Sequence, residues 1–111
     1  MQTTSVLSLG WREGGPELLA RFTAPAKERP ALLPRLAAEL RAEEVLYLVT
    51  CNRVEVAYRS AAALPTNEAR RAVLAVLGSN AATQARAWRA WDGEGAVEHL
   101  FLVAAGLASA K

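Results

Sequence analysis

Cys51 and Arg53 stand two positions apart in the chain, a spacing that could support nucleophilic chemistry. The thiolate is the reactive form of cysteine, and a neighbouring cation favours it over the neutral thiol. Free cysteine is also among the residue types most often buried, so a small apolar residue at a strand end explains Cys51 equally well when it is taken alone. The pair therefore marks a candidate nucleophile that needs support from a second group.

That second group would be His99, since the chain contains a single histidine. Histidine is the side chain best suited to moving protons near neutral pH, so a general base for Cys51 would have to be this residue. His99 lies beside an apolar stripe at helical spacing, and we expect it at the margin of the core, pointing toward a sheet. Taken alone, a histidine satisfied at the edge of the core remains an open alternative.

Composition limits the classes of protein to which the chain could belong. Its 111 residues carry 13 Lys and Arg against 11 Asp and Glu, a net charge of +2, and 52% are hydrophobic. This length allows one compact domain, and the charge balance argues against both a disordered chain and an obvious nucleic-acid clamp. A lone cysteine, no signal peptide and no long apolar run predict a cytoplasmic protein without a membrane span.

Hydrophobic spacing and turn residues predict the elements that must position these side chains. Apolar runs, alternating or continuous, indicate strands, which we expect at residues 5–9, 45–49, 54–58 and within 85–91. Apolar stripes every three to four positions indicate helices, which we expect at residues 31–42, 66–77 and 93–108. The second and third strands then form a hairpin with Cys51 at its turn. A glycine-rich turn at 14–16 leaves the state of 17–22 open.

The order of these elements is β, α, β, β, α, β followed by a trailing helix. It predicts an α+β fold of the ferredoxin-like, split βαβ kind, an antiparallel sheet with helices on one face and a further C-terminal helix. We expect Asp92 to cap that last helix. Its apolar stripe is expected at Val97, Leu100, Phe101, Ala104 and Leu107.

Two segments of the chain resemble the glutamyl-tRNA reductase family, which begins the five-carbon route to tetrapyrroles such as heme. Thr50-Cys51-Asn52-Arg53-Val54-Glu55, preceded by an apolar strand, is similar to the family's active-site signature. Residues 95–101 and 103–107 with Ser109 are similar to the family's segment around its functional histidine. The two segments also lie at about the family's spacing, which makes the resemblance specific.

The resemblance implies a role for each matching residue. Cys51 would attack the ester carbonyl of glutamyl-tRNA to form a thioester, which NADPH reduces to glutamate-1-semialdehyde, and His99 would assist proton transfer. Arg53 would clamp a substrate carboxylate through its planar fork, the alternative being a surface ion pair. The residues that would line the glutamate pocket are Thr50, Asn52 and Ser109.

The resemblance is to the N-terminal catalytic domain, to which residues 1–111 would correspond as a whole. The family's NADPH-binding and dimerisation domains do not fit in this length, and no dinucleotide-binding glycine motif follows a strand. We therefore expect neither a cofactor-binding residue nor a metal site here, and expect that this chain alone cannot complete the reduction. For the full-length enzyme the resemblance implies a homodimer and hand-over of the product to glutamate-1-semialdehyde aminomutase.

Two segments depart from the family's pattern. Residues 11–16, Trp-Arg-Glu-Gly-Gly-Pro, stand where the family has Asn-His-Lys-Thr-Ala-Pro, so the function of that loop is open. Ala108 stands where the family commonly has an acidic residue.

The competing hypothesis is a non-catalytic, ferredoxin-like RNA-binding module. It would hold RNA on the sheet through arginines and a stacked tryptophan, and the candidates are Arg59, Arg86, Arg89 and Trp88. Only Tyr47 and Tyr58 would supply aromatic rings on the central strands. A third hypothesis is an inactive fragment of a reductase. The catalytic hypothesis requires Cys51 and His99 to open onto one pocket with Arg53.

Overall fold

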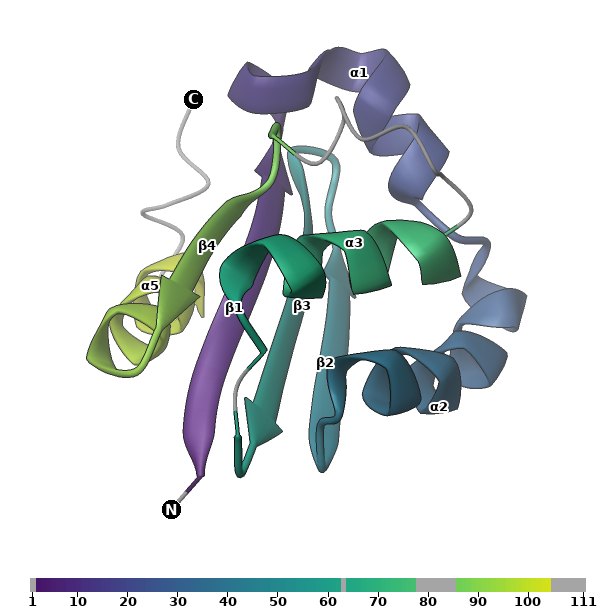
Figure 1. The fold of residues 1–111 in the computed structure, drawn as a ribbon. Coiled ribbons are helices and arrows are strands. Elements are labelled where there is room, and N and C mark those ends of the chain that lie inside the picture. Colours follow the sequence, from purple (N-terminus) through teal and green to yellow (C-terminus); the bar gives the residue numbers. More distant parts are fainter. Residues whose placement is uncertain (1, 63, 78–85, 105–111) are drawn as a thin grey trace.

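A four-stranded antiparallel sheet organises the residues that the computed structural model describes, which are 2–62, 64–77 and 86–104 (Figure 1). Its strands are β1 (Thr3–Gly10), β2 (Glu44–Val49), β3 (Arg53–Ser60) and β4 (Arg89–Asp92). They lie in the order β2-β3-β1-β4, and each neighbouring pair is antiparallel. This arrangement confirms the predicted α+β fold.

Helices cover both faces of the sheet. α2 (Arg29–Leu40) and α3 (Thr66–Val76) pack on one face, as predicted, and α3 crosses in front of the strands in Figure 1. The trailing helix, α5 (Glu94–Ala104), packs against β1 and β4 on the opposite face. α1 (Trp11–Phe22) continues directly from β1, and a 3-10 helix, η1 (Ala26–Glu28), leads into α2.

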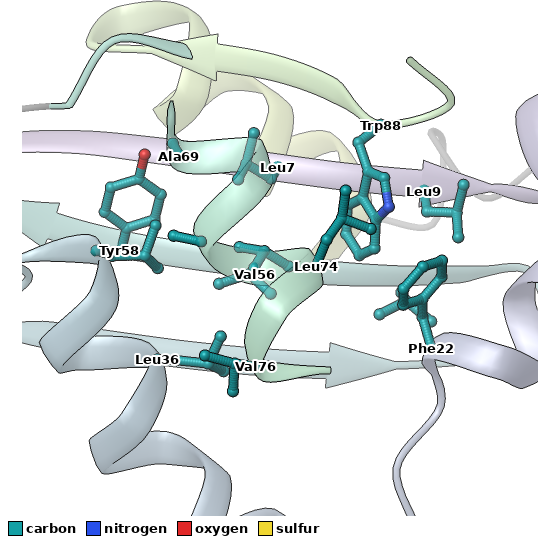
Figure 2. Close-up of a cluster of buried hydrophobic side chains, with 14 of the residues drawn as sticks. Leu7, Leu9, Phe22, Leu36, Val56, Tyr58, Ala69, Leu74, Val76 and Trp88 are labelled. Carbon is teal, nitrogen blue, oxygen red and sulfur yellow. The ribbon is translucent and has the colours of Figure 1, made fainter. Parts of the chain in front are cut away.

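The pleat of the strands explains why the two faces differ, because successive side chains point to opposite sides. Leu7 and Val56 face α3 and belong to a large apolar core, shown in Figure 2. In this core the rings of Phe22 and Trp88 meet edge to face, with centroids 5.5 Å apart. Val6, which precedes Leu7, faces α5 instead. Most of the apolar packing therefore lies on the α2 and α3 side.

α1 occupies the segment in which a glycine-rich turn was predicted. It consists of two helical pieces that meet at Gly15, whose φ of 71° and ψ of 175° are not helical and are readily accessible only to glycine. Pro16 begins the second piece, where a missing backbone N–H removes no helical hydrogen bond. The predicted break at the glycines is therefore present, with short helical pieces on either side of it.

The last helix begins within one residue of its predicted start, but its predicted cap and most of its described apolar stripe are wrong. Asp92 ends β4 instead of capping a helix, and α5 begins at Glu94 after Gly93, whose φ is 61°. Leu100 does pack against the sheet beside the fully buried Ala96, whereas Val97 and Phe101 are 55% and 76% exposed. A small residue at the contact lets the helix approach closely, so Ala96 faces inward in place of Val97 and Phe101. Leu107 lies outside the described residues.

Within the described ranges, none of the helices has the length and apolar character needed to cross a bilayer.

Candidate active site

Glu55 is a fully buried carboxylate near the start of β3, between the sheet and α5. Its Oε2 atom accepts three hydrogen bonds, from Ser8 Oγ at 2.7 Å, Arg53 Nη1 at 3.0 Å and His99 Nε2 at 2.6 Å. A buried carboxylate is tolerated only when it is paired and hydrogen-bonded. We call these four residues, Ser8, Arg53, Glu55 and His99, the Glu55 cluster.

The register of the sheet and one turn of helix assemble this cluster. Ser8 of β1 lies directly opposite Glu55 of β3 in the antiparallel ladder, so their side chains share a face. Arg53 lies two positions before Glu55 and therefore on the same face. His99 follows the buried Ala96 by three positions on α5, which places both on the helix face that meets the sheet.

The imidazole of His99 is held from a second direction by Trp91 of β4. The two rings are stacked, with centroids 3.8 Å apart and planes 13° apart, and the Arg89 guanidinium lies 4.9 Å from the centre of the Trp91 ring. Where Glu55 is an ionised carboxylate it can only accept hydrogen bonds, and Nε2 of His99 is then the atom that donates to it. Nδ1 is then the ring nitrogen that can exchange a proton with another group.

A cavity of about 1000 Å³ opens beside the Glu55 cluster. Its wall combines the end of β1, the first turn of α1, the end of the β2–β3 hairpin, β4 and α5. The wall includes Trp11, Arg12, Asn52, Arg53, Trp91 and His99. Polar, charged and aromatic side chains thus converge on one concave site, which is the usual setting for binding or catalysis.

The structure brings three of the predicted site residues together on this cavity: Asn52, Arg53 and His99. Arg53 forms an ion pair, but a largely buried one, since its side chain is 14% exposed and its partner is Glu55. Thr50 does not line the cavity; its Oγ1 accepts the backbone N–H groups of Asn52 and Arg53, both at 3.2 Å, and so closes the hairpin turn. Ser109 and Ala108 lie outside the described residues.

Cys51 is exposed at the tip of the hairpin turn and is not part of the cavity wall. The side chains of Cys51 and His99 are both described, and no hydrogen bond joins them. Asn52, the next residue, does line the cavity, and its carbonyl accepts a hydrogen bond of 2.9 Å from the backbone N–H of Trp11. Of the three residues that the catalytic hypothesis requires on one pocket, His99 and Arg53 therefore line the cavity, whereas Cys51 does not and lies one residue outside it, at its rim.

A family model described as "Glutamyl-tRNAGlu reductase, N-terminal domain" matches residues 7–110, which include both motif segments. The chain belongs to this family. In a comparison with curated proteins, no significant match was found. The predicted resemblance to glutamyl-tRNA reductase is thus confirmed at the level of its N-terminal domain.

The reductase family implies NADPH, and the described residues do not fit a dinucleotide. Dinucleotides bind where a parallel strand leads through a glycine-rich turn to a helix N-terminus, whereas the strand pairs here are antiparallel. At the junction of β1 and α1, the backbone N–H of Gly10 already donates to the Glu13 carboxylate at 3.1 Å. This carboxylate lies where a phosphate would have to bind and would repel it.

The pattern of the sequence did not identify Glu55, Ser8 or Trp91 as site residues. Glu55 belongs to the motif similar to the reductase signature, yet the alternation of its strand suggested a residue facing solvent. One signal in the sequence was available. The predicted C-terminal helix, with His99 pointing toward the sheet, indicates that the second face of the sheet is also covered, and Glu55 would then be buried beneath that helix.

The aromatic requirement of the RNA-binding hypothesis is not met. Trp88 is 1% exposed and packs on Phe22, so it cannot stack a base. Tyr47 and Tyr58 lie on the face covered by α2 and α3, and burial raises the pKa of both phenols. The three arginines of this hypothesis, Arg59, Arg86 and Arg89, are exposed. Arg59 forms an ion pair with Glu44, with 2.7 Å between Nη1 and Oε1. None of the three aromatic residues that this hypothesis named therefore offers an open ring to RNA.

Proposed function

We propose that this chain accepts the glutamyl group of glutamyl-tRNA on Cys51 as a thioester, the step that prepares its reduction in tetrapyrrole synthesis. The observation that supports this most is the convergence of Asn52, Arg53 and His99 on one cavity beside the Cys51 turn. Membership of the reductase family is consistent with it.

In the proposed step the Cys51 thiolate attacks the carbonyl carbon of the ester. A carbon–sulfur bond forms, the bond between that carbon and the terminal ribose oxygen breaks, and the ribose hydroxyl leaves with a proton. The Nδ1 atom of His99 would take the proton from the thiol and then give it to the leaving oxygen, directly or through water. Because Cys51 lies at the rim, the reacting carbonyl would lie there too, with the glutamyl side chain in the cavity.

The Glu55 cluster would orient the two groups that meet the substrate. Glu55 accepts a hydrogen bond from each of Arg53 and His99, which fixes both side chains before substrate arrives. A guanidinium held in this way loses little further freedom when it binds a carboxylate, and such preorganisation favours both binding and reaction. Glu55 would therefore be a positioning residue, Arg53 the carboxylate clamp and His99 the proton carrier.

Reduction of the thioester needs a nicotinamide site, for which the described residues offer no fit, so this proposal ends at the thioester. It also places the protein in the cytoplasm, where glutamyl-tRNA is available.

Glutamyl-tRNA labelled in its amino acid tests the proposal directly. After incubation with the chain and acid quenching, we expect label on the peptide that contains Cys51. The Cys51→Ser variant should carry none, because a hydroxyl without a strong base is a poor nucleophile. His99→Ala should slow labelling by roughly 100-fold or more if it carries the proton. A folded wild-type chain that takes up no label, or label that persists in Cys51→Ser, would refute the proposal.

A further inference from the structure

The cavity is larger than a glutamyl group requires. Sites of about 300–1,000 Å³ enclose most of a drug-sized ligand, and this cavity, at about 1000 Å³, reaches the upper end of that range. Three residues of the Glu55 cluster, Ser8, Arg53 and His99, form one side of the cavity wall. The remaining wall must therefore contact another part of the substrate.

That remaining wall carries an exposed aromatic ring. Trp11, the first residue of α1, lines the cavity and is still 52% exposed. Arg12 and Arg89 line the same cavity, together with the carboxylates of Glu13 and Glu98, so this side carries charges of both signs. The backbone of Trp11 is fixed beside the reactive turn, because its N–H donates to the carbonyl of Asn52, the residue after Cys51.

We propose that Trp11 is the platform on which the terminal adenine of glutamyl-tRNA stacks while the glutamyl group is transferred. This inference rests on the proposed function. The reacting ester joins the glutamyl group to the ribose of the terminal nucleotide, so with its carbonyl at Cys51 the adenine lies within one nucleoside of that atom. Unpaired RNA ends are recognised largely by stacking of their bases on aromatic side chains, and Trp11 provides an exposed ring of this kind on the wall.

Exposure of an aromatic ring does not by itself identify a site for base stacking. Phe101 is more exposed than Trp11, at 76%, but it lies on α5 and is not part of the cavity wall. What distinguishes Trp11 is its place on the wall and its backbone hydrogen bond to the Cys51 turn. Phe101 therefore provides a matched control, an exposed aromatic residue that this inference does not involve.

Three substrates separate the contribution of the adenosine from that of the glutamyl group: glutamyl-tRNA, 3′-O-glutamyl adenosine and glutamyl methyl ester. For each, the second-order rate of Cys51 acylation is divided by the rate with a free thiol, which removes intrinsic reactivity. The adenosine ester should react roughly 5- to 150-fold faster than the methyl ester after this correction, the range that stacking of one base provides. Trp11→Ala should abolish this advantage, bringing the corrected rate of the adenosine ester down to about that of the methyl ester.

Trp11→Phe retains a ring and should keep most of the advantage, and Phe101→Ala should keep all of it. If Trp11→Ala keeps the full adenosine advantage, or loses the rate with the methyl ester to the same extent, the inference is overturned while acylation stands. If none of the three substrates acylates the wild-type chain, the proposed function fails instead, and the inference fails with it.

Discussion

The two faces of the sheet differ in what they bury. The face under α2 and α3 buries an apolar core that includes Leu7, Phe22 and Trp88. The face under α5 has a small apolar cluster and, beside it, the buried carboxylate of Glu55 with the His99 imidazole. Apolar burial stabilises the fold wherever shapes match, whereas a buried charge costs free energy unless each partner is in place. The first face thus holds most of the apolar packing, and the second holds the side chains to which we assign the proposed chemistry.

Truncating the core face should give the largest effect on stability. Phe22 is 1% exposed and packs on Trp88, so Phe22→Ala should lower the free energy of unfolding by about 3–5 kcal/mol, through lost burial and a cavity. Where this variant is still folded, its acylation rate per folded molecule should match the wild type. Urea unfolding measures the first quantity and labelled glutamyl-tRNA the second.

Phe101→Ala serves as the comparison for that loss, since it removes an aromatic ring that is mostly exposed on the other side of the molecule. Its free energy of unfolding should change by no more than about 0.5 kcal/mol. A loss as large as that of Phe22→Ala would mean that the α5 side also carries the stability.

Dismantling the Glu55 cluster should separate stability from chemistry. Glu55→Gln leaves Arg53 without its buried carboxylate partner and should lower the free energy of unfolding by about 3 kcal/mol, while also slowing acylation. Replacing the charges together, as Arg53→Met with Glu55→Leu and His99→Leu, should restore stability to the wild-type level or about 1–4 kcal/mol above it. Because the triple variant lacks both His99 and Arg53, its rate of Cys51 acylation should be far below that of the wild type.

Denaturant unfolding of the single and triple variants decides the matter. A triple variant less stable than Glu55→Gln would show that the cluster stabilises the fold, and the division between the two faces would have to be abandoned.

A smaller effect than those of Phe22→Ala and Glu55→Gln is expected for the tyrosines of the core face. Burial raises the pKa of Tyr47 and Tyr58 above the ordinary value of 10.0. The neutral phenols are favoured in the folded state, so their contribution to stability is complete below about pH 10 and falls as pH rises from there through the raised values. At neutral pH, Tyr47→Phe should cost about 1 kcal/mol, because its hydroxyl bonds the Phe22 carbonyl and the Ala24 N–H.

Urea unfolding between about pH 8 and pH 11 tests this titration. The decline above about pH 10 should be smaller in a variant with both Tyr47→Phe and Tyr58→Phe. An unchanged decline would assign it to other groups.

Much of the fold could be predicted because hydrophobic spacing is a local property of the chain. The helix predicted at 31–42 is α2, Arg29–Leu40, and the hairpin with Cys51 at its turn is present. α1 could not be predicted in the same way, since Gly14, Gly15 and Pro16 are typical turn residues. The non-helical backbone of Gly15 does separate two helical pieces, and it was the helical state of the residues on either side of it that composition did not reveal.

The site could be predicted only in part, because its decisive contacts join distant parts of the chain. His99 does point toward the sheet, as expected from its place beside an apolar stripe. Its partner Glu55 is 44 positions away, and Ser8 is 47 positions from Glu55. These contacts depend on the register of β1 against β3 and on which face α5 covers, and neither is encoded in a short segment.

The position of α5 at the end of the described chain has a consequence for protein synthesis. The ribosome makes β1 and β3 well before α5, and a nascent chain begins to fold from its N-terminal part. Until α5 emerges and docks, the Glu55 carboxylate can remain hydrated, and the His99 imidazole is not yet beside it. A growing chain can thus begin to form its apolar core first, and the Glu55 cluster is completed only when its last described helix closes over the sheet.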